Sequence, residues 1–494
     1  MLVKELVNTQ RSIKLEKDQV KIGLEIHIQI TALKTKLFCG CSSDYRGKEA
    51  NTLVCPVCLG LPGSLPVTNK RAIDFAIMVA LALNSTISPR TTFYRKNYFY
   101  VDMPKNFQIS QYDKAGGVPL STGGIISFEV NGAVKKVRIK RVQLEEDPAR
   151  LSYYGTIDSS PYTLVDFNRA GIALLEIVTE PDINSPDEAR LFLQKLRSII
   201  EHLGVSNGDL QGSMRCDANI SLQDGKRVEI KNITSFLEVK RALQYEIIRQ
   251  KQLIRRGSTV KQETRHWDAD RRLTISLRTK ETESDYRYFP EPDLVPVEIS
   301  QTWIEEIRSK MPELPDERKI RFVKEYGIPE YDATVITNSK ALADFFEECC
   351  HLYPDAKKIS NWIMTDLTRN LKDLGIEISG SKIKPKHLTD MLRLIDKGEI
   401  SGKIAKELLS KMVSTGDSPQ TIIKRENLLK ISDEAQIKRI VDEVFKEFPK
   451  AVQDAKKDPN AVNYLVGQVM NKTRGKADPE ITNKLIRKML AELE

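Results

Sequence analysis

The chain has 494 residues, a net charge of +9 at pH 7 and 40 % hydrophobic residues. These values are ordinary for a soluble globular protein, and at roughly 150 residues per domain they predict two to four domains. The longest apolar run, Ala72 to Leu83, contains Asp74 and is too short to span a membrane, so no membrane association is expected. The chain opens without the apolar segment of a signal peptide, which favours a cytoplasmic location. Its positive charge is compatible with an RNA partner without establishing one, because basic and acidic residues are interspersed.

Residues 20 to 30 predict a half-buried strand. Apolar side chains occupy every even position from Val20 to Ile30, whereas Glu25 and His27 lie on the opposite, polar face. The same two-residue period, broken by turns, continues to about residue 295. Further predicted strands are Ile125–Val130, Val134–Leu144, Leu174–Val178, Met214–Leu222 and Arg227–Ile233. Helices are predicted at Asn69–Leu83, Pro186–Leu203 and Leu237–Arg256.

The remainder of the chain has a helical pattern. The predicted helices are Gln301–Lys310, Pro315–Tyr326, Ser339–Cys349, Ala356–Asn370, Lys384–Lys397, Ser401–Thr415, Pro419–Asn427, Asp433–Phe448, Ala461–Thr473 and Pro479–Glu492. A sheet-rich first part followed by an all-helical second part predicts the α+β class, with separate domains.

Four cysteines predict a structural zinc site. Cys39-Gly-Cys41 and Cys55-Pro-Val-Cys58 form two close pairs, and tetrahedral Zn²⁺ takes four thiolates. Because four thiolates fill the coordination shell, such a zinc ion would hold the excursion from Leu37 to Pro66 in shape. The alternative is a turn with four reduced thiols and no metal.

Acidic residues on strand faces predict a second, different metal site. Glu25 and His27 project from one face of their strand, and carboxylates with an imidazole suit Mg²⁺ or Mn²⁺. The strand Val134–Leu144 ends in Glu145-Glu146-Asp147, three adjacent acids that repel one another unless a cation lies near. Glu145 and Glu146 point to opposite faces, so only one of them is expected to reach a shared site.

The two strands around residue 224 are predicted to form a hairpin with one polar face. A three-residue loop, Gln223-Asp-Gly225 with a left-handed glycine, pairs Asn219 with Glu229 and Asp217 with Lys231. The resulting face also carries Arg215, and such a mixture of charges suits a nucleotide and a metal better than it suits packing. The glycine-rich phosphate loops of common nucleotide-binding folds do not occur in the sequence.

Many separate motifs resemble the GatB/GatE family, in family order and over nearly the whole chain. In the first part they are Ile22-Gly-Leu-Glu-Ile-His27, Leu61-Pro-Gly63, Leu65-Pro-Val-Thr-Asn-Lys70, Arg95-Lys-Asn-Tyr-Phe-Tyr100, Gln108-Ile-Ser-Gln-Tyr112, Leu144-Glu-Glu-Asp147, Val165-Asp-Phe-Asn-Arg169, Glu176-Ile-Val-Thr-Glu-Pro-Asp182, Arg215-Cys-Asp-Ala-Asn-Ile-Ser221 and Asp285-Tyr-Arg-Tyr-Phe-Pro-Glu-Pro-Asp293. Asn361-Trp362, Ser401-Gly-Lys-Ile-Ala-Lys406 and Val466-Gly-Gln-Val-Met470 resemble the helical part and the YqeY-like tail. The chain length favours the B branch, because the E branch carries a large inserted domain.

The resemblance implies one subunit of a glutamine-dependent tRNA amidotransferase. Such a subunit phosphorylates the side-chain carboxylate of Glu-tRNA(Gln), and often of Asp-tRNA(Asn), with ATP. Ammonia that the glutaminase or A subunit releases from glutamine then displaces the phosphate, and the C subunit joins the other two in a heterotrimer. The alternative is a tRNA-binding scaffold of the same complex that has lost its activity, and the acidic residues that remain in place disfavour it.

The resemblance also implies site residues. It makes Glu25, His27 and Glu146 magnesium or catalytic positions, while Asp217 and Glu229 follow only from the strand geometry. Residues expected to contact ATP phosphates or the substrate carboxylate are Lys96, Arg169, Arg215 and Lys231. Residues expected to contact tRNA are Lys472, Arg474, Lys476, Lys484, Arg487 and Lys488.

The family pattern also sets expected domain boundaries. They are an N-terminal extension (1–19), a catalytic cradle domain (20–295) with the zinc knuckle (37–66), a helical domain (296–410) and a YqeY-like tRNA-binding tail (411–494).

Overall fold

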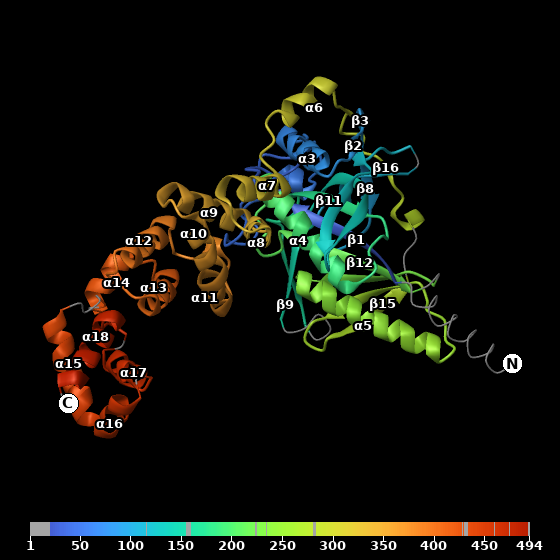
Figure 1. Cartoon of the computed structure of the whole chain (residues 1–494). Helices are drawn as coiled ribbons and strands as arrows, with labels where there is room; N and C mark the ends of the chain where they lie inside the picture. Colours follow the sequence, from blue (N-terminus) through green and yellow to red (C-terminus); the bar gives the residue numbers. More distant parts are fainter. Residues whose placement is uncertain are drawn as a thin grey trace. The chain divides into compact units, whose positions relative to one another are not determined.

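A computed structural model describes residues 20–492 except 115, 155–159, 223–224, 234, 280–282, 427, 429–432, 459 and 474. The chain divides into two compact units, Met1–Pro315 and Asp316–Glu494. Strands form the centre of the first unit, and the elements of the described part of the second unit are helical (Figure 1). The α+β class is therefore confirmed, whereas the extension 1–19 lies outside the described residues.

The first unit is built on a large, mostly antiparallel sheet. Its strands are β1 (Val20–Gln29), β2 (Thr86–Ile87), β4 (Phe93–Asn97), β5 (Phe107–Gln111), β6 (Ser121–Thr122), β7 (Ile125–Val130), β8 (Ala133–Glu146), β11 (Ala173–Thr179), β12 (Met214–Leu222), β13 (Val228–Ile233), β14 (Glu263–Asp268), β15 (Leu273–Thr279) and β16 (Phe289–Pro290). Two small pairs lie beside it: β9 (Arg150–Tyr153) with β10 (Thr163–Asp166), and β3 (Arg90–Thr91) with β17 (Val297–Glu298). The main path runs β15-β14-β13-β12-β1-β11-β8-β5-β4-β16, so β1 lies near its middle.

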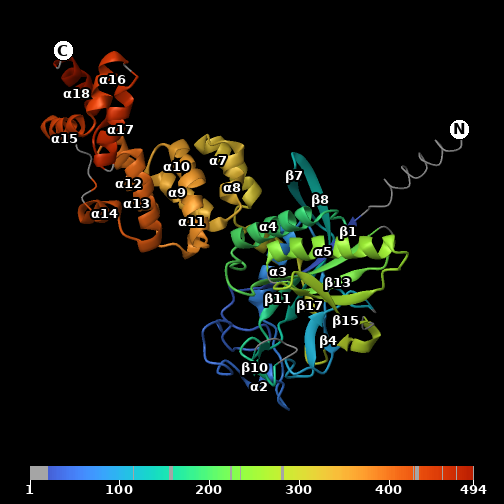
Figure 2. The ribbon, with the colours of Figure 1, turned by 90° about the horizontal axis from the view of Figure 1, so that it is seen from below.

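Helices cover the apolar face of this sheet. They are α3 (Lys70–Ala82), α4 (Pro186–His202) and α5 (Phe236–Arg255), and α2 (Pro56–Leu59), η1 (Glu283–Tyr286) and α6 (Gln301–Arg308) complete the unit. Helices α4 and α5 lie side by side along the sheet (Figure 2). The even residues of β1 from Ile22 to Ile30 have at most 1 % exposed surface and belong to one core with these helices, as the alternation predicted. The odd residues therefore face the opposite side.

Helix α6 belongs to the first unit rather than to the helical region. Ile304 and Ile307 are buried in the core of the sheet unit, and the Trp303 indole donates a hydrogen bond of 2.8 Å to Asp74. The expected boundary after residue 295 thus falls one helix too early, because a helical period does not reveal which core a helix packs against.

The second unit contains two separate hydrophobic cores. Its elements are α7 (Pro315–Tyr326), α8 (Glu330–Thr337), α9 (Lys340–Leu352), α10 (Ala356–Trp362), η2 (Ile363–Leu367), α11 (Thr368–Leu374), η3 (Ile378–Gly380), α12 (Pro385–Asp396), α13 (Gly402–Thr415), α14 (Pro419–Glu426), α15 (Glu434–Glu447), α16 (Pro449–Lys457), α17 (Val462–Lys472) and α18 (Pro479–Glu492). One core extends from Phe322 to Leu428 and the other from Ile437 to Leu490. The expected tail boundary after residue 410 therefore lies inside α13, whose Met412 and Val413 pack in the first of these cores.

Candidate functional site

Strand register gathers the polar side chains of three strands, β1, β11 and β12, on one face of the sheet. β1 pairs with β11 and β12, and its Glu25 lies opposite Asp217 while His27 lies opposite both Arg215 and Glu176. In an antiparallel pair, directly opposite residues project to the same side. The polar face predicted for β1 therefore continues across the neighbouring strands β11 and β12.

An acidic cluster surrounds the His27 imidazole. Its Nε2 lies 3.4 Å from a carboxylate oxygen of Glu145, 3.7 Å from Glu25 and 3.9 Å from Glu176. One ligand atom from each of Glu25, His27 and Glu176 can be chosen so that all lie within 4.8 Å of one another. Carboxylates held this close repel one another, and a cation between them would relieve that repulsion.

The pKa values in this cluster reflect its excess of negative charge. Burial, together with the charges of Glu25 and Glu145, raises the pKa of Glu176 to about 7. Burial acts against the charged form of His27, yet the three surrounding carboxylates raise its pKa above the usual value. Burial alone would raise the pKa of Glu25, but His27, Lys231 and Lys96 lower it. Protonation therefore reduces the repulsion between these carboxylates, and a bound divalent cation would reduce it in the same way.

Glu145, and not Glu146, reaches this cluster. Both oxygens of Glu146 lie within 2.6 Å of the Lys105 ammonium, and one also accepts a 2.8 Å hydrogen bond from the backbone N–H of Ile109. Glu176 lies opposite Gln143 in β8, so Gln143 and Glu145 share its face and Glu146 points away. The structure therefore places Glu145, and not Glu146 as expected, beside Glu25 and His27.

The hairpin of β12 and β13 has the predicted register from Ala218 to Ile220, but a bulge shifts it between Cys216 and Ala218, so the predicted pairing of Asp217 with Lys231 does not continue the ladder. Asn219 pairs with Glu229, which confirms that the two polar faces coincide. The Lys231 ammonium lies 3.0 Å from Asp217 and 3.5 Å from Glu229, so both acids sit beside a lysine. Residues 223 and 224 of the turn lie outside the described part of the chain, but Gly225 is described and does not have the left-handed conformation predicted for it.

The side chain of Lys96 extends from β4 over the same polar face, where it contacts aromatic rings. Its ammonium lies 5.0 Å from the ring centre of Tyr286 and 5.8 Å from that of Tyr98. Among the described residues no carboxylate lies within ion-pair distance of it. Burial opposes its charge, but Glu145 and other nearby groups raise the pKa of Lys96, so it is a cation turned toward the acidic cluster.

Two of the predicted arginines lie around Asp147 instead. Arg215 makes a 2.7 Å ion pair with the fully buried Asp147 carboxylate. Arg169 lies 3.7 Å from the same group and donates hydrogen bonds to the carbonyls of Pro148 and Ala149. Arg169 therefore holds the end of β8 in place, while Arg215, opposite His27, lies at the edge of the acidic face.

A hollow of about 620 Å³ opens over this polar face. Acidic residues and cations both line it, among them Glu25, Glu145, Glu176, Glu229, Lys96, Lys231, Lys140 and Arg141. A site of this size can hold a nucleotide-sized ligand, and its lysines complement phosphates while its acids complement a metal.

Sequence reasoning missed four contributors to this hollow. Glu176 is a lone acid in an otherwise apolar central strand, and that isolation is the signal that could have identified it. Arg141 makes a 3.0 Å ion pair with Glu176. Tyr288 stacks on Tyr112 with ring centres 4.1 Å apart, and both rings line the hollow; their family motifs are the signal that could have identified them.

The four cysteines of the predicted knuckle lie together. Their sulfur atoms all lie within 4.8 Å of one another, which fits the donor set of tetrahedral zinc. A hydrogen bond from Cys39 lowers the pKa of Cys58 to about 4, so one sulfur already favours the thiolate that a metal requires. The donors fit Zn²⁺.

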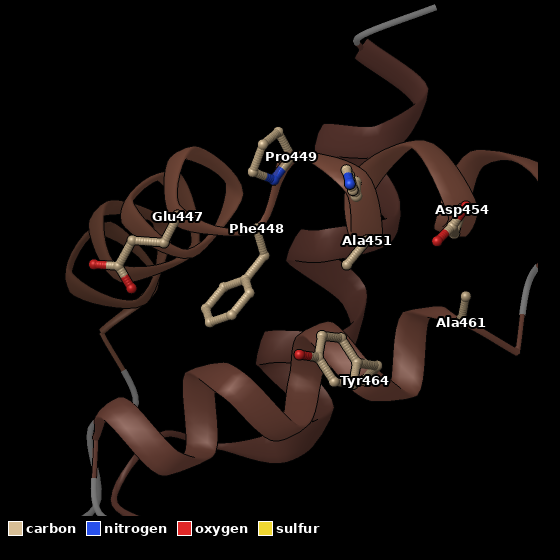
Figure 3. Close-up of a pocket in the computed structure, with 8 residues that line it drawn as sticks. Glu447, Phe448, Pro449, Ala451, Asp454, Ala461 and Tyr464 are labelled. Atoms are coloured by element: carbon tan, nitrogen blue, oxygen red, sulfur yellow. The ribbon is translucent and has the colours of Figure 1, made fainter.

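The predicted tRNA-binding residues lie at the end of the second unit. Lys484, Arg487 and Lys488 are exposed on α18, whereas exposed Lys472 pairs with Glu443 at 2.9 Å and Glu447 at 2.6 Å. Lys476 is half-buried, and Arg474 lies outside the described residues. A pocket of about 640 Å³ opens in the same bundle, and Phe448 and Tyr464, which line it, meet edge to face with ring centres 6.1 Å apart (Figure 3).

These features define a class of protein: a sheet domain with a hollow lined by acidic and basic residues, followed in the chain by helical domains. No helix in the described part of the chain has the length and apolarity needed to cross a membrane. The model of the GatB/GatE catalytic domain matches residues 20–305, and that of the GatB domain matches residues 344–490. The chain belongs to the GatB/GatE family, which confirms the resemblance.

Relatives match over nearly their full length. The protein named as the B subunit of aspartyl/glutamyl-tRNA(Asn/Gln) amidotransferase in Sulfurisphaera tokodaii is 55 % identical over 472 residues, covering 95 % of this chain and 99 % of the relative. Proteins of the same name from Thermotoga maritima and Carboxydothermus hydrogenoformans are 50 % and 48 % identical, covering 95 % and 96 % of this chain and 98 % of each relative.

Proposed function

We propose that this chain is the B subunit of a glutamine-dependent tRNA amidotransferase, an ATP-dependent carbon–nitrogen ligase. It would activate the side-chain carboxylate of Glu-tRNA(Gln), Asp-tRNA(Asn) or both, and then amidate it. One observation carries the proposal: the acidic cluster around His27 shares one hollow with the cations Lys96 and Lys231, within the family's catalytic domain.

The reaction requires two displacements. A carboxylate resists ammonia because its oxygen is a poor leaving group. In the first step a carboxylate oxygen attacks the γ-phosphorus of ATP, and ADP leaves with the electron pair of the broken P–O bond. In the second step ammonia attacks the acyl carbon of the resulting acyl phosphate, inorganic phosphate leaves, and the amide nitrogen loses a proton.

The acidic cluster would hold Mg²⁺ with the ATP. Glu25, His27 and Glu176 have the required donor atoms close together, and Glu145 lies within reach of the same imidazole. Bound there, Mg²⁺ would neutralise phosphate charge. Asp217 on β12 and Glu229 on β13 would act indirectly: their ion pairs with Lys231 would hold its ammonium toward the hollow.

The cations would bind the anionic parts of the substrates. Lys96 and Lys231 both line the hollow, so they are placed to contact phosphate or the substrate carboxylate. Arg215 would contribute from the edge through its ion pair with Asp147, and Arg169 would act indirectly by fixing the strand end. The aromatic rings around Lys96 would help to exclude water, which would otherwise hydrolyse an acyl phosphate.

The remaining parts of the chain would provide support and partners. Zinc bound by Cys39, Cys41, Cys55 and Cys58 would be structural. Exposed Lys484, Arg487 and Lys488 would bind tRNA phosphates, with weaker contributions from Lys472, Arg474 and Lys476. The A and C subunits would complete a heterotrimer, in which the glutaminase supplies ammonia from glutamine, in the cytoplasm where aminoacyl-tRNA is made.

Reconstitution tests the proposal directly. The chain is combined with the A and C subunits, Glu-tRNA(Gln), glutamine, ATP and Mg²⁺, and formation of Gln-tRNA and ADP is measured. Glu25→Ala should abolish ATP-dependent activation while glutamine hydrolysis by the glutaminase continues, and Glu129→Ala, an exposed acid on β7, serves as the matched control. A wild-type complex that binds tRNA but forms no Gln-tRNA would instead support the scaffold alternative.

A further inference from the structure

A completely buried lysine lies beside the zinc knuckle. Lys36 has 0 % exposed surface and is among the largest fully buried side chains of the described residues. Its ammonium donates a 2.9 Å hydrogen bond to the carbonyl of Leu53 and a 3.4 Å one to that of Phe167. It also lies 3.7 Å from the sulfur of Cys58.

This environment leaves a buried positive charge to be balanced. Removing an ammonium from water costs several kcal/mol, and carbonyl dipoles solvate the charge without neutralising it. No carboxylate among the described residues lies within ion-pair distance of the Lys36 ammonium. The sulfur of Cys58 is therefore the contact that can carry the opposing charge.

A loaded knuckle would supply that charge. Zinc bound by four thiolates is a dianionic centre, and such a centre buried in protein needs donors and cations around it. We propose that Lys36 is the built-in counter-ion of the zinc knuckle: its ammonium stabilises the tetrathiolate charge through Cys58 and so slows metal loss. This inference depends on zinc occupying the knuckle and not on the amidotransferase reaction.

The same lysine connects the knuckle to the strand end that carries Glu145. The next residue, Leu37, donates a 2.9 Å hydrogen bond to the Gly171 carbonyl, and the Gly171 N–H donates one of 2.9 Å to Asp147. A Cβ atom placed on Gly171 would lie 3.5 Å from the Lys36 side chain. The segment that carries Lys36 therefore joins the knuckle to the end of the acidic strand.

Zinc release from the full-length chain tests the proposal. Zinc content is first measured in the purified wild type, and transfer of zinc to a chromogenic chelator is then followed in time. Lys36→Met, which keeps the length and loses the charge, should release zinc at least about tenfold faster. Lys36→Gln keeps a hydrogen-bond donor without charge and should behave similarly, whereas Lys34→Met, an exposed lysine two residues away, should match the wild type.

Thermal unfolding distinguishes a counter-ion role of Lys36 from a role in packing alone. With zinc bound, Lys36→Met should unfold at a lower temperature than wild type, because the centre has lost its counter-ion. After zinc removal the same variant should be equally or more stable, because it no longer buries an ammonium. Wild-type release rates in both Lys36 variants, or equal destabilisation with and without zinc, would overturn the proposal. A wild-type chain purified without zinc would overturn it together with the zinc assignment, leaving the amidotransferase proposal to its own assay.

Discussion

The His27 imidazole lies 3.4 Å from Glu145, whereas Glu146, the next residue, makes an ion pair with Lys105 at 2.5 Å. Two adjacent carboxylates thus serve two different sites, one on each face of the same strand. One faces the acidic cluster around His27, and the other pairs with Lys105.

This relationship predicts opposite phenotypes for two conservative substitutions. Glu145→Gln should lower ATP-dependent activation about a hundredfold or more with little loss of stability, because it removes a charge from the acidic cluster. Glu146→Gln should leave the cluster intact but destabilise the fold by about 3 kcal/mol, because it leaves the Lys105 ammonium without its buried partner. ADP formation and urea unfolding measure the two effects. The reverse pattern would restore Glu146 to the metal site.

Mg²⁺ binding should depend on pH through Glu176. Its pKa is raised to about 7, so at lower pH a proton must leave before the carboxylate can bind metal. His27, whose pKa is also raised, must lose its proton too, so affinity should rise more than tenfold per pH unit below about pH 7 and level off only when both groups are deprotonated. Titration with Mn²⁺, followed by electron paramagnetic resonance, measures this. Glu176→Gln should bind more weakly with a flatter profile, and an unchanged slope in that variant would exclude Glu176 as the titrating group.

The order of strands explains what sequence reasoning could and could not predict. The alternation in β1 predicted which of its residues are buried, and face matching predicted the Asn219–Glu229 pair, because both depend on nearby residues. The choice between Glu145 and Glu146 depends on which distant strands flank β1, and local sequence does not state that. The predicted single helix Ala356–Asn370 likewise contains a π-helical segment, Ile363–Leu367, that a 3.6-residue period cannot reveal.

Removing the charge of Lys96 should impair substrate use without impairing folding. Lys96→Met should lower kcat/KM for ATP or aminoacyl-tRNA about a hundredfold, because a cation facing the hollow is lost. Its melting temperature should stay within about 2 °C of wild type, because no ion pair among the described residues is broken. Lys140→Met, an exposed lysine that also lines the hollow, is the control. Equal kinetic effects from both variants would indicate a general field effect rather than a specific contact.

Loss of one knuckle cysteine should remove zinc and destabilise the first unit. Cys55→Ser should purify with far less zinc than wild type, since three thiolates and a hydroxyl bind it poorly. Its melting temperature should fall by at least about 5 °C, because metal binding contributes to the folding free energy. Cys350→Ser, in the helical unit and outside the cluster, should change neither property. Elemental analysis and calorimetry decide this, and full zinc occupancy in Cys55→Ser would contradict the site.

The basic residues of α18 should contribute more to tRNA binding than Lys472 does. Lys484, Arg487 and Lys488 are exposed, whereas Lys472 already pairs with Glu443 and Glu447 and would have to give up those contacts to bind phosphate. Alanine at all three α18 positions should weaken tRNA binding at least about tenfold and reduce the steepness of its salt dependence, because each phosphate contact releases counterions. Lys472→Ala should change affinity less than about threefold. Filter binding over a range of salt concentrations measures both, and an unchanged salt slope in the triple variant would show that tRNA does not contact this helix.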